Sequence, residues 1–189
     1  MENQTIQRKF NKNQFIPLVL IGSGLIILGL LLARALTSTT PALNYSVVPS
    51  EVNFPAPKLV LNDLNGNLVN IADYQPKIVM INNWATWCPP CKAEMPTLEK
   101  YYKAHSDQGF MLLGIEAGDP NKDVASFVDE LGITFPILID PETTSLTAFR
   151  NDSLPSSYVI DRNGNVILAW TGPINRDMLE KYVTPLLEQ

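Results

Sequence analysis

A strand-type segment runs directly into a helix-type segment, and the chain's two cysteines lie where the segments meet. Residues 77–84, KIVMINNW, are mostly apolar and rich in β-branched side chains, which is typical of a buried strand. Residues 92–105, KAEMPTLEKYYKAH, carry apolar side chains three or four positions apart, which indicates a helix. Cys88 and Cys91 are therefore predicted to lie at a strand-to-helix turn, where the helix begins.

The spacing of the two cysteines favours redox chemistry. At a helix N-terminus the unpaired N–H groups and the helix dipole favour an anion, and the thiolate is the reactive form of cysteine. We therefore expect Cys88 to be the nucleophile and Cys91, one turn further on, to close a disulfide with it. A purely structural disulfide here would enclose only two residues and constrain the unfolded chain little. A zinc site needs about four ligands, and the single histidine, His105, is expected to be solvated near a helix end.

The two prolines between the cysteines refine this expectation. Pro89, at the first helical position, is preorganised for helix entry. Pro90 has no N–H, so it offers the Cys88 thiolate no backbone hydrogen bond. A less stable thiolate means a less stable reduced form and a lower redox potential. The pattern therefore favours a reductant over an oxidant.

The remaining segments predict an α/β domain with a mixed sheet. Asn65–Gly66 and residues 162–165, RNGN, each separate two apolar runs and predict two hairpins. Strands that alternate with helices early in the chain, followed by an antiparallel hairpin, indicate a mixed sheet covered on both faces. The other predicted elements are strands at residues 110–116 and 135–140 and helices at residues 124–131, 143–149 and 178–186.

An uncharged apolar run precedes this domain. Residues 15–33 carry no charge, and about 1.5 Å per residue gives a helix of roughly 28 Å, close to the thickness of a bilayer core. Basic residues cluster before this run, so the positive-inside rule predicts a cytoplasmic terminus at 1–14, a transmembrane anchor at 15–33 and the remainder outside the cytoplasm. A cleaved signal peptide is the alternative, but its apolar region is usually about 7–15 residues long. Residues 34–53, rich in Pro, Ser and Thr, form the predicted linker to a domain at 54–189.

Charge is distributed unevenly along the chain. The formal net charge is -5; residues 1–34 carry four basic groups and one acid, whereas the rest carries ten basic and eighteen acidic groups. Nucleic-acid binding needs clustered Lys and Arg. The acidic domain therefore argues against a nucleic-acid partner, and the predicted membrane topology explains the basic terminus.

The stretch NNWATWCPPCKAEMP resembles the motif of the ResA/TlpA-like thiol-disulfide oxidoreductases, which are membrane-anchored members of the thioredoxin superfamily. Trp87 before the cysteines, Pro96 after them and the late Leu154–Pro155 match the family's pattern. The resemblance covers residues 54–189. It implies a thioredoxin-like three-layer fold with a mixed central sheet, helices on both faces and an N-terminal β-hairpin extension.

The resemblance also implies roles for residues around the dithiol. Pro155 matches the family's cis-proline, which packs against the dithiol, although Ser156 and Ser157 follow it where the family usually has two threonines. The backbone of Leu154 would then pair with an extended substrate chain. The implied substrate surface consists of Trp87, Pro89, Pro90 and Leu154.

Two carboxylates are candidates for moving the proton of the second cysteine. Where thioredoxin has a buried aspartate, this chain has Asn82, which cannot titrate. The family instead carries a glutamate three residues after the second cysteine, and Glu94 occupies that place, on the same helix face as Cys91. The alternative for Glu94 is a solvated, partly exposed carboxylate. Glu116, at the end of a predicted strand, resembles a second acid of the family and is the other candidate for a proton relay.

The function implied by the resemblance is reduction of protein disulfides outside the cytoplasm, with no cofactor besides the Cys88–Cys91 disulfide and no metal. A membrane thiol-reducing protein of the CcdA or DsbD kind would recharge the dithiol, and apocytochrome c awaiting haem attachment would be a substrate. Three alternatives remain open. An oxidase would use the same fold in the opposite direction, a thioredoxin-fold peroxidase would need a peroxidatic cysteine in a different setting, and a non-catalytic thiol-binding module would keep its function without the cysteines.

Overall fold

The computed structural model describes residue 29, residues 47–119 and residues 121–188. The predicted cytoplasmic terminus, the predicted anchor apart from residue 29, and the predicted linker up to residue 46 lie outside the described residues. No helix in the described part of the chain combines the length and the apolar content needed to cross a membrane. The elements below belong to one compact unit within residues 43–189.

Strands and helices alternate along most of this unit. The order is β1 (Ser50–Pro55), β2 (Val60–Asp63), β3 (Leu68–Asn70), the 3-10 helix η2 (Ile71–Tyr74), β4 (Ile78–Trp84), α2 (Pro89–His105), the 3-10 helix η3 (Ser106–Gln108), β5 (Phe110–Ala117), α3 (Asn121–Leu131), β6 (Ile137–Asp140), α4 (Thr144–Phe149), β7 (Ser156–Ile160), β8 (Asn165–Thr171), α5 (Arg176–Tyr182) and α6 (Thr184–Leu187).

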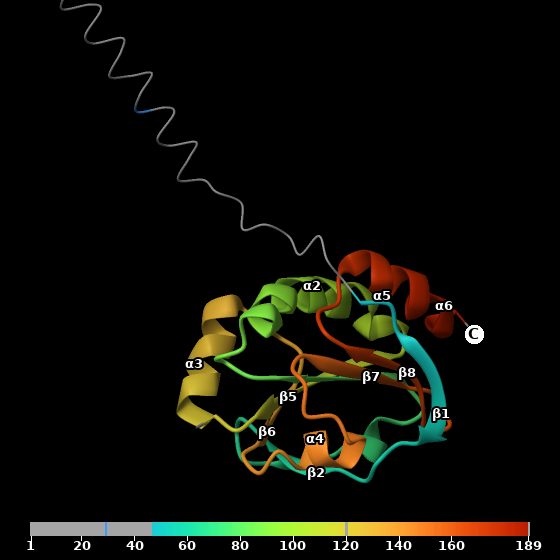
Figure 1. Cartoon of the computed structure of the whole chain (residues 1–189), viewed down its shortest axis with the longest axis horizontal. Helices are drawn as coiled ribbons and strands as arrows, with labels where there is room; N and C mark the ends of the chain where they lie inside the picture. Colours follow the sequence, from blue (N-terminus) through green and yellow to red (C-terminus); the bar gives the residue numbers. More distant parts are fainter. Residues whose placement is uncertain (1–28, 30–46, 120, 189) are drawn as a thin grey trace, which may run out of the picture. The chain divides into compact units, whose positions relative to one another are not determined.

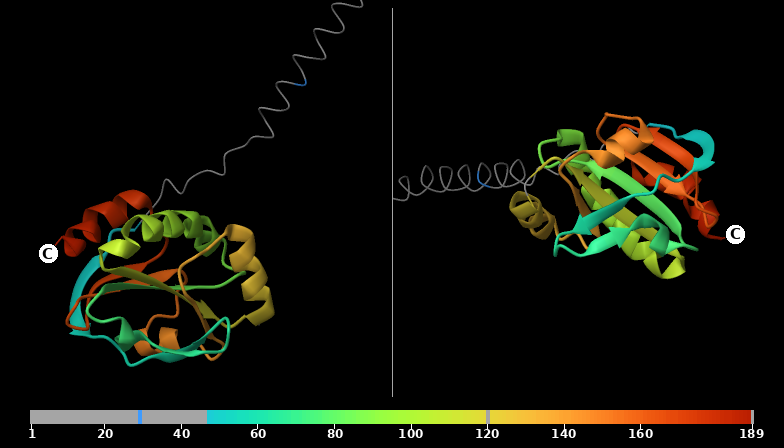
Figure 2. Two further views of the ribbon diagram at one scale, coloured as in Figure 1. Left: turned by 180° about the vertical axis from the view of Figure 1, so that it is seen from behind. Right: turned by 90° about the horizontal axis from the view of Figure 1, so that it is seen from below.

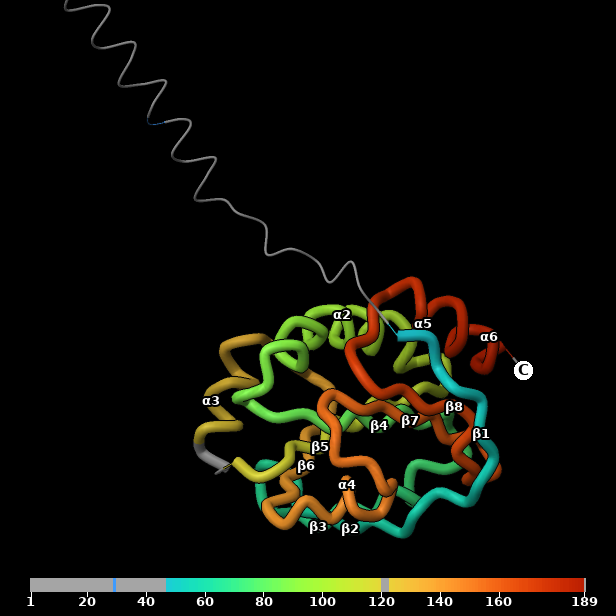
Figure 3. The backbone as a smooth tube through the Cα atoms, viewed as in Figure 1, coloured from blue at the N-terminus to red at the C-terminus, as the bar shows by residue number. Residues whose placement is uncertain are grey.

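The strands form one eight-stranded sheet in the order β1-β8-β7-β4-β5-β6-β2-β3. β5 lies between β4 and β6 and is parallel to both, whereas the other neighbouring pairs are antiparallel. The mixed sheet and the two hairpins predicted from the sequence, β2–β3 and β7–β8, are therefore confirmed. Figure 3 traces β4, β5 and β7 through the middle of the sheet. The carboxyl ends of β4 and β5 meet at one edge, which is where the predicted site residues gather.

Helices cover both faces of the sheet, as predicted. Figures 1 and 2 show α2, α5 and α6 on one face and α4 on the opposite face. The alternation of side chains along β4 explains the two cores that result. Ile78 and Met80 belong to the core that contains α2, whereas Val79 and Ile81 belong to the core on the other face.

Strand β1 begins inside the segment predicted to be linker. Ser50 pairs with Ala169 and Pro55 with Asn165, in antiparallel register with β8. Most side chains of β1 are exposed, so the strand lacks the alternating apolar pattern by which a half-buried strand is recognised. The folded domain therefore starts before the predicted boundary at residue 54.

The predicted last helix is interrupted. α5 ends at Tyr182, and α6 starts at Thr184. Pro185 follows directly and has no N–H to continue the hydrogen-bond ladder of α5. The apolar side chains that predicted one helix at residues 178–186 therefore lie on two short helices, α5 and α6, and on the residue between them.

The expectation that His105 is solvated is wrong. Its side chain is buried, and its Nδ1 lies 3.0 Å from the backbone oxygen of Tyr101. The two rings stack, with centroids 4.2 Å apart. Because residues four positions apart share a helix face, Tyr101 covers the imidazole.

Candidate active site

Cys88 lies where β4 passes into α2. It is the N-cap residue of α2, and Pro89 and Pro90 occupy the first helical turn. The Sγ of Cys88 accepts a hydrogen bond from the backbone N–H of Cys91 at 3.3 Å. The predicted position of Cys88 at the start of the helix is therefore confirmed. A thiolate at this atom would face the positive end of the helix dipole.

Cys88 and Cys91 form a disulfide, with Cα atoms 5.3 Å apart. Both side chains are buried in this state, with Cys88 3% exposed and Cys91 0% exposed. Trp87, in contrast, is 65% exposed directly beside Cys88. Beside the buried disulfide, Trp87 therefore offers an exposed aromatic surface.

The peptide bond between Leu154 and Pro155 is cis, as the family resemblance implied. Pro155 is buried, and Leu154 is half-buried against the core on the α2 face. The two serines that follow Pro155 begin β7 and pair in register with Asn82 and Asn83 of β4. Side-chain hydrogen bonds reinforce this pairing: the Nδ2 of Asn82 donates to Ser157 at 2.9 Å, and the Nδ2 of Asn83 donates to Ser156 at 3.3 Å.

The alternative of a solvated Glu94 is wrong. Glu94 is fully buried, and each of its carboxyl oxygens accepts one hydrogen bond. The Nδ2 of Asn82 donates to Oε1 at 2.8 Å, and the backbone N–H of Ile174 donates to Oε2 at 2.8 Å. Helical spacing puts Glu94 in the turn after Cys91, on the same helix face. Asn82, on β4, thus donates hydrogen bonds both to Glu94 of α2 and to Ser157, the second residue after the cis-proline.

Burial raises the pKa of Glu94 to about 8, against the opposing effect of the hydrogen bonds from Ile174 and Asn82. Removal from water disfavours the charged carboxylate, whereas the two donors favour it. A carboxyl group with a pKa near neutrality can both take up and release a proton in the physiological range. Glu94 therefore has the protonation behaviour expected of a general acid or base.

Glu116 is buried at the end of β5, where it pairs in register with Trp84 of β4. Its pKa is also raised to about 8, first by burial and then by the hydrogen bond and negative charge of Asp119. The backbone N–H of Asp119 lies 3.2 Å from each carboxyl oxygen of Glu116. Glu116 and Glu94 thus lie in separate hydrogen-bonded groups.

Asp119 and Thr86 also belong to the site, and the sequence analysis missed them. The Oδ2 of Asp119 accepts hydrogen bonds from the N–H of Thr86 at 2.9 Å and from its hydroxyl at 2.7 Å. One signal could have found Asp119: it is a second acid three residues after the acid that ends a buried strand. The carboxyl end of a parallel strand is where such side chains meet the neighbouring loop.

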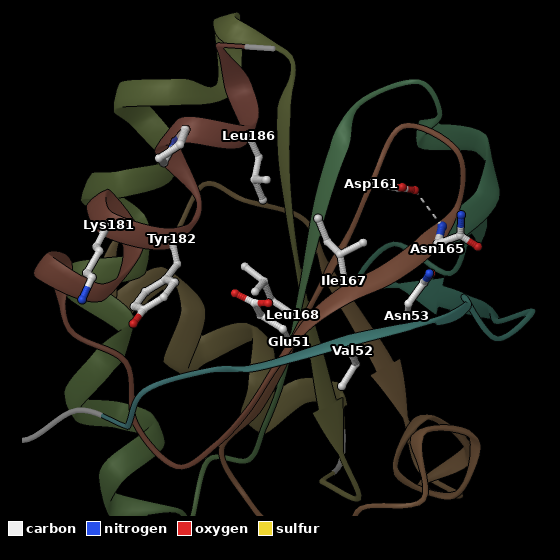
Figure 4. Close-up of a pocket in the computed structure, with 11 residues that line it drawn as sticks. Glu51, Val52, Asn53, Asp161, Asn165, Ile167, Leu168, Lys181, Tyr182 and Leu186 are labelled. Atoms are coloured by element: carbon white, nitrogen blue, oxygen red, sulfur yellow. Dashed lines mark hydrogen bonds between the residues drawn. The ribbon is translucent and has the colours of Figure 1, made fainter.

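A separate groove of about 520 Å³ lies elsewhere on the domain, between β1, β8 and the C-terminal helices. Figure 4 shows Glu51 and Leu168 in its middle and Tyr182 and Lys181 on one side. None of the site residues predicted from the sequence lines it. The groove is therefore separate from the dithiol.

Among the residues that the structure describes, no group of three or more His, Cys, Asp or Glu side chains is placed to hold a metal ion.

Comparison with known proteins agrees with the geometry. The AhpC/TSA family matches residues 52–169. The thiol-disulfide oxidoreductase ResA of Geobacillus kaustophilus is 37% identical over 132 residues, which are 70% of this chain and 76% of that protein. ResA of Bacillus subtilis is 33% identical over 128 residues, which are 68% of this chain and 72% of that protein. The chain belongs to the ResA family of thiol-disulfide oxidoreductases.

A solved structure supports the same family fold. The crystal structure of a putative thiol:disulfide interchange protein DsbE from Chlorobium tepidum superposes with a TM-score of 0.67 at 25% identity, covering 73% of this chain and 98% of that one. The predicted thioredoxin-like α/β fold is therefore confirmed. As a ResA-family enzyme, the protein exchanges thiols and disulfides, and Cys88 and Cys91 form a disulfide within it.

Proposed function

We propose that the protein is a membrane-anchored reductase of protein disulfides outside the cytoplasm, with Cys88 as nucleophile and Cys91 as the resolving cysteine. The position of Cys88 Sγ as the N-cap of α2 carries this assignment. A thiolate there is favoured by the helix dipole, whereas Cys91 lies inside the first turn and is fully buried.

The reaction starts from the reduced dithiol. The Cys88 thiolate attacks one sulfur of a substrate disulfide, a mixed disulfide forms, and the other substrate sulfur leaves as a thiolate that takes a proton from water. Cys91 then loses its proton and attacks the sulfur of Cys88. The mixed disulfide breaks, the second substrate thiolate leaves and is protonated, and two electrons have passed from the enzyme to the substrate.

Glu94 is the proposed acceptor of the Cys91 proton. It lies one helical turn beyond Cys91, and its carboxyl group is fully buried on the same helix face. Asn82 and the backbone of Ile174 hold both carboxyl oxygens in place. The carboxyl group is therefore held in place before the second step, and its ionised form, about a tenth of the molecules at pH 7 for a pKa of about 8, receives the proton.

The cysteine roles are tested by trapping. Cys91→Ser keeps the nucleophile and loses the resolving thiol, so it accumulates mixed disulfides with a protein substrate such as insulin. Cys88→Ser forms none. Trapping by Cys88→Ser in place of Cys91→Ser would reverse the assignment, and exchange function retained after replacement of both cysteines would favour a non-catalytic thiol-binding module.

The direction of transfer is tested by the redox potential. Pro90 offers no N–H to the Cys88 thiolate. The reduced form is therefore less stabilised, and the couple more reducing, than with a residue at position 90 that has a backbone N–H. We expect a potential nearer to that of thioredoxin, about -270 mV, than to that of DsbA, about -120 mV. A value near the latter would favour the disulfide-forming oxidase, and rapid consumption of hydrogen peroxide would favour the peroxidase.

The membrane part of the proposal rests on the uncharged run at residues 15–33 and the basic residues before it. A reporter that works only outside the cytoplasm, fused after Gln189, should be active, and a reporter that works only inside should be silent.

In an oxidising compartment the dithiol must be recharged. We propose a membrane thiol-reducing protein of the CcdA or DsbD kind as the electron donor and apocytochrome c as a substrate; Cys91→Ser would trap the latter as a mixed disulfide.

A further inference from the structure

The loop that presents the dithiol is held by a side chain from outside the predicted site. Asp119, two residues beyond the end of β5, accepts both the N–H and the hydroxyl hydrogen of Thr86 on one oxygen. Thr86 stands directly before the exposed Trp87 and two residues before Cys88. Asp119 therefore fixes the segment between β4 and α2 from which the redox couple begins.

Asp119 is in turn coupled to Glu116. Its N–H lies 3.2 Å from both carboxyl oxygens of Glu116, and the two carboxyl groups interact directly. Against the effect of its own burial, hydrogen bonds from Glu116 and Thr86 hold the pKa of Asp119 below its usual value, while the pKa of Glu116 is raised to about 8. Opposite shifts of this kind are typical of two carboxyl groups that share one proton.

Two other charged groups face this pair in the described residues. Asp140, at the end of β6, adds negative charge near Glu116. Lys92, on α2, adds positive charge near Asp119, and its Nζ also lies 5.3 Å from the centroid of the Phe127 ring. With Glu116 protonated, two negative charges lie near one positive charge, and ionisation of Glu116 makes this three against one.

We propose that Asp119 is a positioning residue for thiol–disulfide exchange, and that the proton on Glu116 controls how firmly Asp119 holds Thr86 and the active-site loop. With Glu116 protonated, the pair carries one negative charge, and Asp119 keeps both hydrogen bonds to Thr86. With Glu116 ionised, Asp119 faces a second carboxylate, whose two oxygens lie 3.2 Å from the Asp119 backbone N–H. Repulsion then favours movement of Asp119 away from Glu116, and the loop before Cys88 loses its anchor.

This device has a distinctive consequence for the pH profile. Ionisation of the cysteines alone makes exchange faster as pH rises. Loss of the Thr86 anchor above about pH 8 works in the opposite direction, so the rise levels off or reverses in the wild type. Glu116→Gln carries no ionisable proton, so the ratio of the rate at pH 9 to the rate at pH 7 should be several-fold higher than in the wild type.

The positioning role is tested by the reduction of insulin disulfides, with the full-length protein and dithiothreitol as the terminal reductant. Asp119→Ala removes the oxygen that accepts both hydrogen bonds from Thr86 and should lower kcat/KM about tenfold at pH 7. Thr86→Val removes only the hydroxyl and should cost about threefold. Thr86→Ser restores the hydroxyl and should recover most of that loss, which separates positioning from general packing.

A spectroscopic measurement isolates the proton on Glu116. In the oxidised enzyme the cysteines do not titrate, so the backbone amide signal of Thr86 reports the anchor without interference from thiols. We expect this signal to titrate with a midpoint near pH 8 in the wild type and in Glu94→Gln. The titration should vanish in Glu116→Gln and in Asp119→Ala.

An Asp119→Ala enzyme with the wild-type kcat/KM, or a Thr86 signal that titrates alike in wild type and Glu116→Gln, would overturn the proposal. Thermal unfolding shows whether each variant is folded. If Asp119→Ala does not fold, Thr86→Val and Thr86→Ser still test the hydrogen bond between Asp119 and the Thr86 hydroxyl. The proposal rests on the exchange chemistry of the family and not on the direction of transfer. A redox potential near that of DsbA would therefore overturn the reductase function and leave the Thr86 titration unaffected.

Discussion

Glu94 and Glu116 are two buried carboxyl groups with the same raised pKa of about 8, in different surroundings. Both oxygens of Glu94 accept hydrogen bonds from neutral donors, one from Asn82 and one from the backbone of Ile174. Glu116 faces a second carboxylate, that of Asp119. For Glu94, burial alone raises the pKa, and the hydrogen bonds from Ile174 and Asn82 lower it. For Glu116, the negative charges of Asp119 and Asp140 add to the effect of burial.

The comparison teaches that one pKa can support two kinds of chemistry. A carboxyl group held by neutral donors keeps its position whichever way it is protonated, which suits the proton exchange with Cys91 proposed for Glu94. A carboxyl group paired with another acid changes the force on its partner when it ionises, which suits a residue that adjusts the position of a loop. The following changes separate the two cases.

The largest expected effect is on the pH dependence of stability. The native pKa of Glu94 lies above its unfolded value of 4.5, so the native state binds more protons between about pH 4.5 and 8. Its contribution to the free energy of unfolding therefore falls as pH rises through this window and is constant above it. Glu94→Gln should remove the Glu94 contribution to this slope, while that of Glu116 remains, and should gain on the order of 4 kcal/mol relative to wild type between pH 5 and pH 9. Urea unfolding at both pH values measures this.

The same variant is not expected to be severely destabilised at pH 5. The Oδ1 of Asn82 has no partner within the described residues, so a rotated Asn82 amide can accept a hydrogen bond from the side-chain amide that Glu94→Gln introduces. This accommodation, and not exposure of residue 94, is the reason to expect little loss, because Glu94 is buried. A difference between variant and wild type that does not change with pH would show that Glu94 keeps an ordinary pKa.

The next effect is on the second chemical step. Glu94→Gln cannot accept the Cys91 proton, so release of substrate from the mixed disulfide should slow about tenfold at pH 7. Formation of the mixed disulfide by Cys88 serves as the internal control, since it needs no proton transfer from Cys91. Stopped-flow measurement of the two phases distinguishes them. Equal slowing of both phases would contradict the proposed role of Glu94.

A smaller effect distinguishes the causes of the two raised pKa values. Asn82→Ala removes a donor to Glu94 and should raise the Glu94 pKa further, by about one pH unit. Asp119→Asn removes a negative charge beside Glu116 and should lower the Glu116 pKa by a similar amount. Titration of the side-chain carboxyl carbons by NMR measures both. Shifts in the same direction would mean that burial alone governs the two groups.

The smallest effect is expected at Ser157, whose hydroxyl accepts the second hydrogen bond of Asn82. Ser157→Ala leaves the bond from Asn82 to Glu94 in place, so it should cost about 1 kcal/mol of unfolding free energy. The Glu94 pKa should barely move. Ser156→Ala is the matched control, because Ser156 accepts from Asn83 instead. A large shift of the Glu94 pKa in Ser157→Ala would show that Ser157 orients the Asn82 amide.

Local pattern predicted most of the fold. The apolar run of β4, the helical spacing of α2 and the Asn–Gly turns of the two hairpins depend on neighbours close in the chain, and all were found. β1 and the break before α6 were missed. β1 is stabilised by pairing with β8, more than a hundred residues away in the chain, and its own side chains are mostly exposed. Such a strand has little sequence signal of its own.

The sequence by itself determined that the two cysteines lie at a strand-to-helix turn, because two cysteines three residues apart at the start of a helix depend only on local geometry. Glu94 and Glu116 could be named from the resemblance, but not their burial. The fold buries Glu94 and brings Asn82 of β4 and the backbone of Ile174, eighty residues away, to its two oxygens. Asp119 gains its role only when β5 ends beside Thr86, thirty-three residues away in the chain. Solvation and charge pairing depend on which distant segments pack together, so the tertiary structure alone decided the protonation behaviour of the site.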